Sequence, residues 1–179
     1  MKTTGKFLVA LLSLIILLVA CNKKGQTGTM TVKMKDNPVE FEAVYVEVLR
    51  VEVQHSNSSG GSSGWINLET EAGIYNLLEL QNGLTATLSE NVTLPVGRVN
   101  QMRLILGSQN SVQVEGQAFP LLLSSQDETG LKFNLNANIN ADQNVEVLFD
   151  FDAEKSIVIE GTGSFRLKPV IKVESVIYN

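Results

Sequence analysis

The sequence predicts an all-β protein, a single-domain antiparallel β-sandwich, and three observations support this prediction. Short segments alternate apolar and polar residues with a period of two, as half-buried strands do. Turn-forming Gly, Asn and Pro residues separate these segments. No segment after residue 28 carries the long apolar stripe of an amphipathic helix. About ten short strands of this kind fit two packed sheets.

The first 20 residues are predicted to be a cleavable signal peptide that takes no part in the fold. Lys2 and Lys6 supply a positively charged start, and residues 7–20 are apolar except for Ser13. This apolar run is shorter than the roughly 20 residues that a comfortable transmembrane helix needs.

A lipobox-like motif ends this leader. Residues 18–21 read Leu-Val-Ala-Cys, and Cys21 is the only cysteine in the chain. We expect cleavage before Cys21 and acylation of its thiol, which would anchor the protein in a membrane of the cell envelope, at the outer membrane or cell surface. An ordinary secretory signal or an uncleaved anchor is the alternative. Residues 21–28 then form a lipidated tether, and residues 29–179 form the domain.

The charge balance argues against nucleic acid as a partner. Removing Lys2 and Lys6 from the 14 basic residues leaves 12 against 19 acidic ones, a net charge of −7. Nucleic-acid phosphates require a basic footprint. With Cys21 acylated, no thiol remains for a disulfide or a thiolate metal site, and we expect no cofactor.

The first strands show clear alternation. Residues 29–35 place Met30, Val32 and Met34 on one face. In residues 43–53 the phase of the valines slips by one position, which predicts a β-bulge near Leu49 and Arg50 or a strand that changes sheets. The valines before and after the slip are Val44, Val46 and Val48, then Val51 and Val53.

The remaining segments continue the pattern of short strands and turns. Residues 56–64 contain only Ser, Asn and Gly and predict a flexible hairpin loop, because strand signals resume at Trp65. Residues 74–80 fit either a strand or a helical turn. Further strands are expected at residues 98–106, 112–114, 119–123, 131–135, 144–151, 156–160, 164–167 and 170–177.

Several short motifs follow one another in a fixed order along the chain: Asp36-Asn37-Pro38, Val46–Val53 with Glu52, Trp65, Tyr75–Leu80, Gly97–Leu106, Phe149–Asp152 and Leu167–Ile171. As an ordered set they resemble the domain of unknown function 4382 family over nearly all of residues 28–177. One departure is Ser124-Ser125, where the family pattern suggests a Pro-Ser pair. The resemblance implies a β-sandwich of the prealbumin-like, carbohydrate-binding-like or immunoglobulin-like kind, and it implies no established activity.

The chain has few of the side chains that commonly carry catalysis, so we expect that the protein is not an enzyme. His55 is the only histidine, and it ends a strand beside the polar loop, where we expect it to be exposed to solvent. Nucleophilic catalysis that depends on histidine, and sites with several histidine ligands, therefore lack their residues. Paired carboxylates could still hydrolyse glycosides, but a sandwich with short loops offers them little pocket.

Residues 150–154 carry a carboxylate at every second position. Asp150, Asp152 and Glu154 would converge on one side if the segment stayed extended, and hard oxygen ligands suit calcium. The spacing lacks the glycine and distal glutamate of an EF-hand loop. The alternative is structural use, in which Asp150 and Asp152 cap the turn into Ser156 or pair with Lys168 or Arg103.

Trp65 and Tyr75 are the candidate ligand-binding aromatics. Sugar-binding domains lay exposed aromatic rings against sugars, and Trp65 lies at the rim of the polar loop. The favoured alternative is that Trp65 anchors the core, because it begins the alternating run Trp-Ile-Asn-Leu.

Together these observations predict a non-catalytic binding module on a cell-envelope lipoprotein, with carbohydrate as the leading ligand by analogy of fold. The alternative is a structural or adhesion component that binds an envelope protein through an edge strand.

Overall fold

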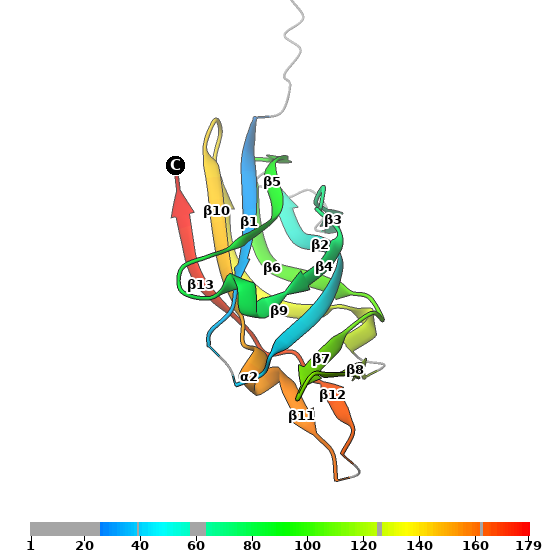
Figure 1. Ribbon diagram of the computed structural model, residues 1–179. Helices are drawn as coiled ribbons and strands as arrows, with labels where there is room; N and C mark the ends of the chain where they lie inside the picture. The colour runs from blue at the N-terminus through cyan, green and yellow to red at the C-terminus, as the bar shows by residue number, and fades with distance from the viewer. Residues whose placement is uncertain (1–25, 39, 58–63, 125–126, 162) are drawn as a thin grey trace, which may run out of the picture.

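The computed structural model describes residues 26–179 except 39, 58–63, 125–126 and 162, and within these residues it is an all-β sandwich (Figure 1). The smaller sheet has four strands in the order β13 (Ile171–Tyr178), β10 (Asn144–Phe151), β1 (Thr27–Lys35) and β5 (Ala86–Pro95). The predicted fold class is therefore confirmed.

The larger sheet of the described chain has nine strands and is organised around β2 (Ala43–Asn57). The strands β3 (Gly64–Asn67) and β4 (Gly73–Asn76) pair with one edge of β2, and β6 and β7 pair with the other. The main path of this sheet runs through β11 (Ile157–Ile159), β12 (Phe165–Leu167), β8 (Gln117–Leu123), β7 (Ser111–Val114), β2, β6 (Gly97–Leu106) and β9 (Leu131–Ile139).

Short helical turns connect some of the strands. The 3-10 turn η1 (Leu77–Leu80) follows β4, η2 (Asp127–Thr129) precedes β9, and α2 (Ala153–Ser156) follows β10. The segment that the sequence left open between strand and helical turn is thus divided into β4 and η1. No helix among the described residues is both long enough and apolar enough to span a bilayer.

Two strand pairings among the described residues are parallel, which departs from a fully antiparallel sandwich. β1 pairs with β10 in parallel, and β8 pairs with β12 in parallel. The partners in each pair are separated by a long stretch of chain, and a parallel pair needs such a crossover rather than a hairpin.

The core lies between the inner faces of the two sheets. Met30, Val32 and Met34 of β1 are fully buried, as their alternation predicts. The largest buried side chains include Phe149 and Phe151 of β10, and they join the same hydrophobic cluster. Close packing of both inner faces therefore supplies the main stabilisation, at about 25 cal/mol per Å² of buried apolar surface.

The β-bulge predicted in β2 is present. The register against β6 passes from Val48–Leu106 to Arg50–Ile105, so Leu49 is the extra residue. The valines on both sides of the bulge are fully buried. The bulge therefore keeps the apolar face of β2 directed inward in both halves of the strand.

His55 is buried, so the expectation that it is exposed to solvent was wrong. It is only 3% exposed, and its Nε2 lies 2.9 Å from the carbonyl oxygen of Pro95. The strand continues past His55, which has the same inward phase as Val53 after the bulge. Gly97 lies close to the imidazole, because a Cβ on it would be 2.7 Å from Nε2.

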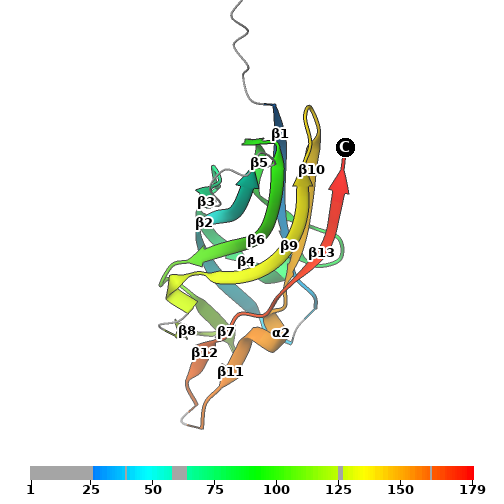
Figure 2. The ribbon, with the colours of Figure 1, turned by 180° about the vertical axis from the view of Figure 1, so that it is seen from behind.

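The described chain has two distinct ends. β1 starts at the upper end in Figure 1, and β13 finishes there as well. The lower end holds α2, β7 and β8 and the projecting β11–β12 hairpin. From behind, β9 and β13 run close together (Figure 2), and the backbone N–H of Asn138 donates to the hydroxyl of Tyr178 at 3.2 Å.

The buried aromatic centre gives the first prediction. Replacing Phe149 with Ala should lower the unfolding free energy by about 3–5 kcal/mol, because it removes a fully buried ring and leaves a cavity. Leu122, which is 60% exposed, serves as the control, and Leu122→Ala should change stability by about 0.5 kcal/mol or less. Urea denaturation measures both, and equal losses in the two variants would contradict this account of the core.

Candidate functional site

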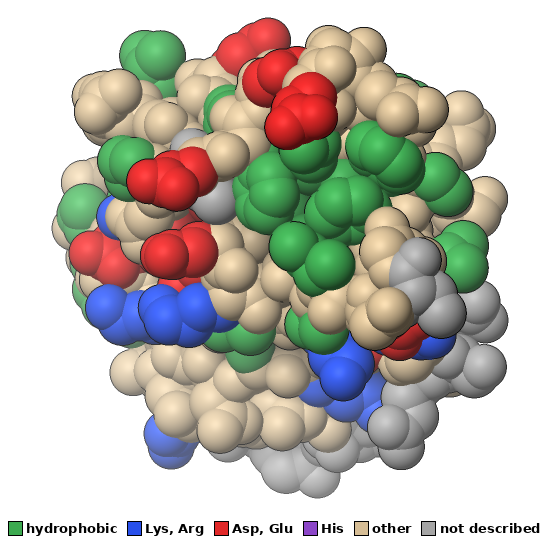
Figure 3. Space-filling model, turned by 60° about the horizontal axis from the view of Figure 1, so that its bottom comes forward, with side chains coloured by type: hydrophobic (Ala, Val, Ile, Leu, Met, Phe, Trp, Pro, Cys, Tyr) green, Lys and Arg blue, Asp and Glu red, His purple; other side chains and the backbone are tan. Residues whose placement is uncertain are grey.

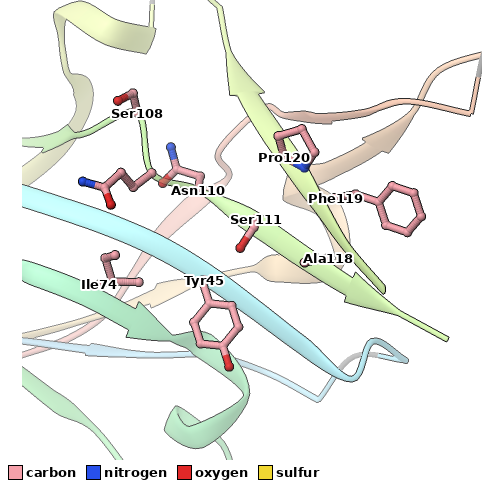
Figure 4. Close-up of a pocket in the computed structure, with 9 residues that line it drawn as sticks. Tyr45, Ile74, Ser108, Asn110, Ser111, Ala118, Phe119 and Pro120 are labelled. Atoms are coloured by element: carbon pink, nitrogen blue, oxygen red, sulfur yellow. The ribbon is translucent and has the colours of Figure 1, made fainter. Parts of the chain in front are cut away.

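A shallow recess lies on the outer face of the larger sheet, near its lower end. Its volume is about 600 Å³. Figure 4 shows Tyr45 of β2 and Ile74 of β4 on one side and residues of β7 and β8 on the other. The loop between β6 and β7 closes the remaining side with its polar side chains. The lining residues are Tyr45, Ile74, Ser108, Gln109, Asn110, Ser111, Ala118, Phe119 and Pro120.

The strand register places Tyr45, Ser111 and Pro120, which line the recess, on the outer face of the larger sheet. Tyr45 lies opposite Ser111 of β7 and opposite Asn76 of β4, and Ser111 lies opposite Pro120 of β8. Residues directly opposite each other in a ladder share a face. Tyr45 is therefore directed outward, whereas its neighbours Val44 and Val46 enter the core.

The loop that closes the recess is tightly bound to Glu47 of β2. The backbone N–H of Gly107 donates to the Glu47 carbonyl at 2.8 Å, and that of Gln109 donates to Oε2 at 2.8 Å. The Oδ1 of Asn110 accepts from the Glu47 N–H at 2.9 Å. A Cβ on Gly107 would overlap the Glu47 carboxylate in this position, so glycine lets the carboxylate reach the loop. The loop is thus held in place before any ligand arrives, which lowers the entropic cost of binding.

The recess offers an aromatic ring, amides and hydroxyls. Tyr45 is 36% exposed and Ile74 is 52% exposed. The polar lining residues are Gln109, Asn110 and two serines, and no described lining residue is charged. Such a surface is suited to a neutral ligand that has both an apolar face and hydroxyl groups.

Trp65 is not a core anchor, and the preference for that role was wrong. It is half-buried and lies outside the hydrophobic core, whereas the next residue, Ile66, packs against the core. Trp65 pairs with Gln54 on the outer face of the sheet, and the guanidinium of Arg103 lies 4.4 Å from its ring centroid. The run Trp-Ile-Asn-Leu does alternate, but it is Ile66, which pairs with the buried Val53, that faces the core, and not Trp65.

Tyr75, the other aromatic candidate, is turned toward the core. It pairs with the buried Val46, and its half-buried ring packs against the hydrophobic cluster. Its hydroxyl donates to the carbonyl oxygen of Glu71. Burial raises the pKa of the Tyr75 hydroxyl, and the nearby Glu71 charge raises it further. Tyr75 therefore stabilises the connection to β4 and does not line the recess.

The three candidate calcium ligands are not brought together. β10 ends at Phe151, and Asp152 caps α2 by accepting from the N–H of Lys155 at 3.0 Å. The alternation therefore stops before Glu154, which is exposed. In the described part of the chain, no three His, Cys, Asp or Glu side chains are grouped so as to hold a metal ion. Asp152 has the capping role that the sequence allowed as the alternative.

Burial sets Asp150 apart from Asp152. Burial tends to raise the pKa of Asp152, but the hydrogen bonds and charge of Lys155 lower it below its ordinary value. The Asp150 carboxyl is 4% exposed, its Oδ2 accepts from Asn37, and its Oδ1 has no described hydrogen-bond partner. Burial raises the pKa of Asp150, and the charge of Asp152 adds to this effect.

The raised pKa of Asp150 gives a prediction about pH. A carboxyl whose pKa is higher in the folded state favours folding below its unfolded pKa, near 3.9, and this contribution is lost as the pH rises through the folded pKa. Raising the pH from about 3 to about 7 should therefore increase the stability of the Asp150→Asn variant relative to that of the wild type. Urea unfolding at both pH values measures the difference. Glu90→Gln, at an exposed position of β5, is the control. A difference in stability between the wild type and Asp150→Asn that does not change with pH would contradict the prediction.

The sequence contained a signal for Tyr45 but not for its neighbours. Tyr45 is out of phase with Val44 and Val46, which marks it as outward-facing. The loop at residues 107–110 gave no comparable signal, because its contact with β2 depends on hydrogen bonds between residues about 60 positions apart.

The family comparison agrees with the resemblance found in the motifs. The model of the domain of unknown function DUF4382 matches residues 27–169, which includes the strands of the recess. No curated protein and no solved structure matches the chain. Because the matched region covers most of the sequence, the chain belongs to the DUF4382 family.

Proposed function

We propose that the protein is a cell-envelope lipoprotein whose β-sandwich binds a neutral carbohydrate without catalysing a reaction, and that the Tyr45 recess is the binding site. The observation that carries the proposal is that a single recess is lined by the exposed Tyr45 ring, the amide of Gln109 and two serine hydroxyls, those of Ser108 and Ser111. A sugar presents an apolar ring face and polar hydroxyls, which match these two kinds of group. The absence of charge among the described lining residues favours a neutral sugar over an acidic one.

The position of the lipobox supports an outward-facing site. Residues 1–25 lie outside the described part of the chain, so the lipidation of Cys21 stays a prediction. Cys21 precedes the start of β1 at Thr27 by six positions, which an extended chain spans in about 20 Å. An acyl anchor on Cys21 would hold the upper end of the domain near the membrane. The recess, near the opposite end, would then point away from the membrane.

A second candidate is a protein partner at the lower end, and it has its own supporting observation. β11 is an edge strand of the larger sheet, and its Ile159 is 65% exposed. Figure 3, which brings the lower end forward, shows hydrophobic side chains gathered on this surface. An edge strand with exposed apolar residues can pair with a strand of another protein.

Replacement of Cys21 tests the anchor. Cys21→Ser removes the thiol that accepts the acyl chains, so the variant should appear in the soluble fraction or remain an unprocessed precursor. Fractionation and mass spectrometry of the intact protein measure this. A wild-type protein that keeps Met1, or an unmodified Cys21 in the wild type, would show that the lipoprotein proposal is incorrect.

Replacement of Tyr45 tests the recess. Tyr45→Ala should weaken binding to a neutral glycan identified on a glycan array by at least about tenfold, or about 1.4 kcal/mol, because it removes the aromatic platform. Tyr178→Ala is the matched control, since Tyr178 is 45% exposed on β13 of the other sheet. An equal loss of glycan affinity in the two variants would show that the sugar does not bind in the Tyr45 recess. A wild-type protein that binds no glycan on the array would instead favour the protein partner.

A further inference from the structure

A second polar surface covers the outer face of the larger sheet above the β-bulge. Strand register places Gln54, Trp65 and Gln101 in one row across β3, β2 and β6, and Asn134 of β9 continues this row. The next row contains Asn67, Glu52, Arg103 and Lys132. We call these two rows, with Arg50 and Arg98, the Trp65 face.

A buried carboxylate holds the centre of the Trp65 face. Glu52 is only 3% exposed, although it points to the outer side, because Arg50 and Arg103 cover it. The Nε of Arg103 donates to Oε2 at 2.6 Å, and the Nε of Arg50 donates to Oε1 at 2.7 Å. Burial alone would raise the pKa of Glu52, but the two guanidinium groups outweigh it and lower the pKa. Glu52 thus fixes both arginines in position.

The indole of Trp65 is bordered by two cations. The guanidinium carbon of Arg103 lies 4.4 Å from the ring centroid, and the ammonium of Lys132 lies 6.0 Å from it. Both separations allow cation–π attraction. The half-buried ring is therefore held rigidly and still has exposed surface.

The Trp65 face is basic in a chain whose net charge is −5. On β3, β6, β9 and the part of β2 above the bulge, one described carboxylate, Glu52, opposes four cations, which leaves a formal charge of +3. The four cations are Arg50, Arg98, Arg103 and Lys132. Neither Arg98 nor Lys132 forms an ion pair with a described side chain, so both can meet a ligand. Exposed amides of Asn134, Asn136 and Asn138 lie beside them on β9.

We propose that the Trp65 face binds a carboxylated polysaccharide, at a site separate from the Tyr45 recess. In a polyuronate such as polygalacturonate, each ring carries one carboxylate for the cations, hydroxyls for the amides and an apolar face for Trp65. An extended polymer also matches a flat surface formed by several adjacent strands. A nucleic acid is a poorer fit, because the acidic protein as a whole repels a dense row of phosphates.

The fluorescence of Trp65 gives a direct test, because it is the only tryptophan in the chain. The full-length protein is titrated with polygalacturonate, with neutral dextran and with single-stranded DNA, followed by fluorescence and by calorimetry. We expect saturable binding of polygalacturonate that weakens as salt is added, no change of Trp65 fluorescence with dextran, and at least fivefold weaker binding of DNA. Arg98→Ala with Lys132→Ala should raise the dissociation constant at least tenfold.

The control is Lys172→Ala, which removes a cation with a 74% exposed side chain from β13 of the other sheet and should leave the affinity unchanged. Tyr45→Ala should also leave the affinity for polygalacturonate unchanged. The experiment therefore distinguishes a failure of this proposal from a failure of the proposed Tyr45 recess. An absence of polygalacturonate binding would overturn the proposal. Equal binding of DNA, or an equal loss in Lys172→Ala, would overturn it as well, because either result indicates unspecific charge attraction.

Discussion

The larger sheet depends on a single extra residue in β2. This strand is 15 residues long and pairs with β3, β4, β6 and β7. The side chains of β2 therefore determine which residues of these four strands face the core and which face outward. Without Leu49 as a bulge, the phase of Val44, Val46 and Val48 would carry Arg50, Glu52 and Gln54 into the core. Burying two charged groups and an amide in place of two valines would be strongly unfavourable. The bulge removes that conflict and leaves the polar side chains on the outer surface.

The same strand positions both surfaces to which we assign binding. Below the bulge, Tyr45 faces outward and Glu47 holds the loop that closes the recess. Above the bulge, Glu52 holds Arg103 against Trp65. In each case a carboxylate of β2 orders the groups that would meet a ligand. The two surfaces differ in charge, and the neutral recess and the basic Trp65 face therefore suit different carbohydrates.

Local pattern was sufficient to predict the sandwich, most of its strands and the bulge, because side-chain alternation is a property of consecutive residues. It was not sufficient where a residue's role depends on a distant partner. Trp65 and Ile66 alternate as expected, yet only the pairing with Gln54 and Val53 decides which of them faces outward. Similarly, Asp150, Asp152 and Glu154 have the spacing of a convergent set only in a strand, and the cap that Asp152 provides to α2 ends that strand. The burial of His55 likewise follows from the continuation of β2 beyond the apolar run.

The central claim is that the outer face of the larger sheet is the binding face of this protein. Mapping of backbone amide chemical shifts by NMR during titration with a bound saccharide tests it most directly. The account predicts shifts confined to the surroundings of Tyr45 and the 107–110 loop for a neutral sugar, or to β3, β6 and β9 around Trp65 for an acidic one. The amides of β10 and β13 in the other sheet should not move. Shifts centred on β10 and β13, with the outer face of the larger sheet unaffected, would contradict the claim.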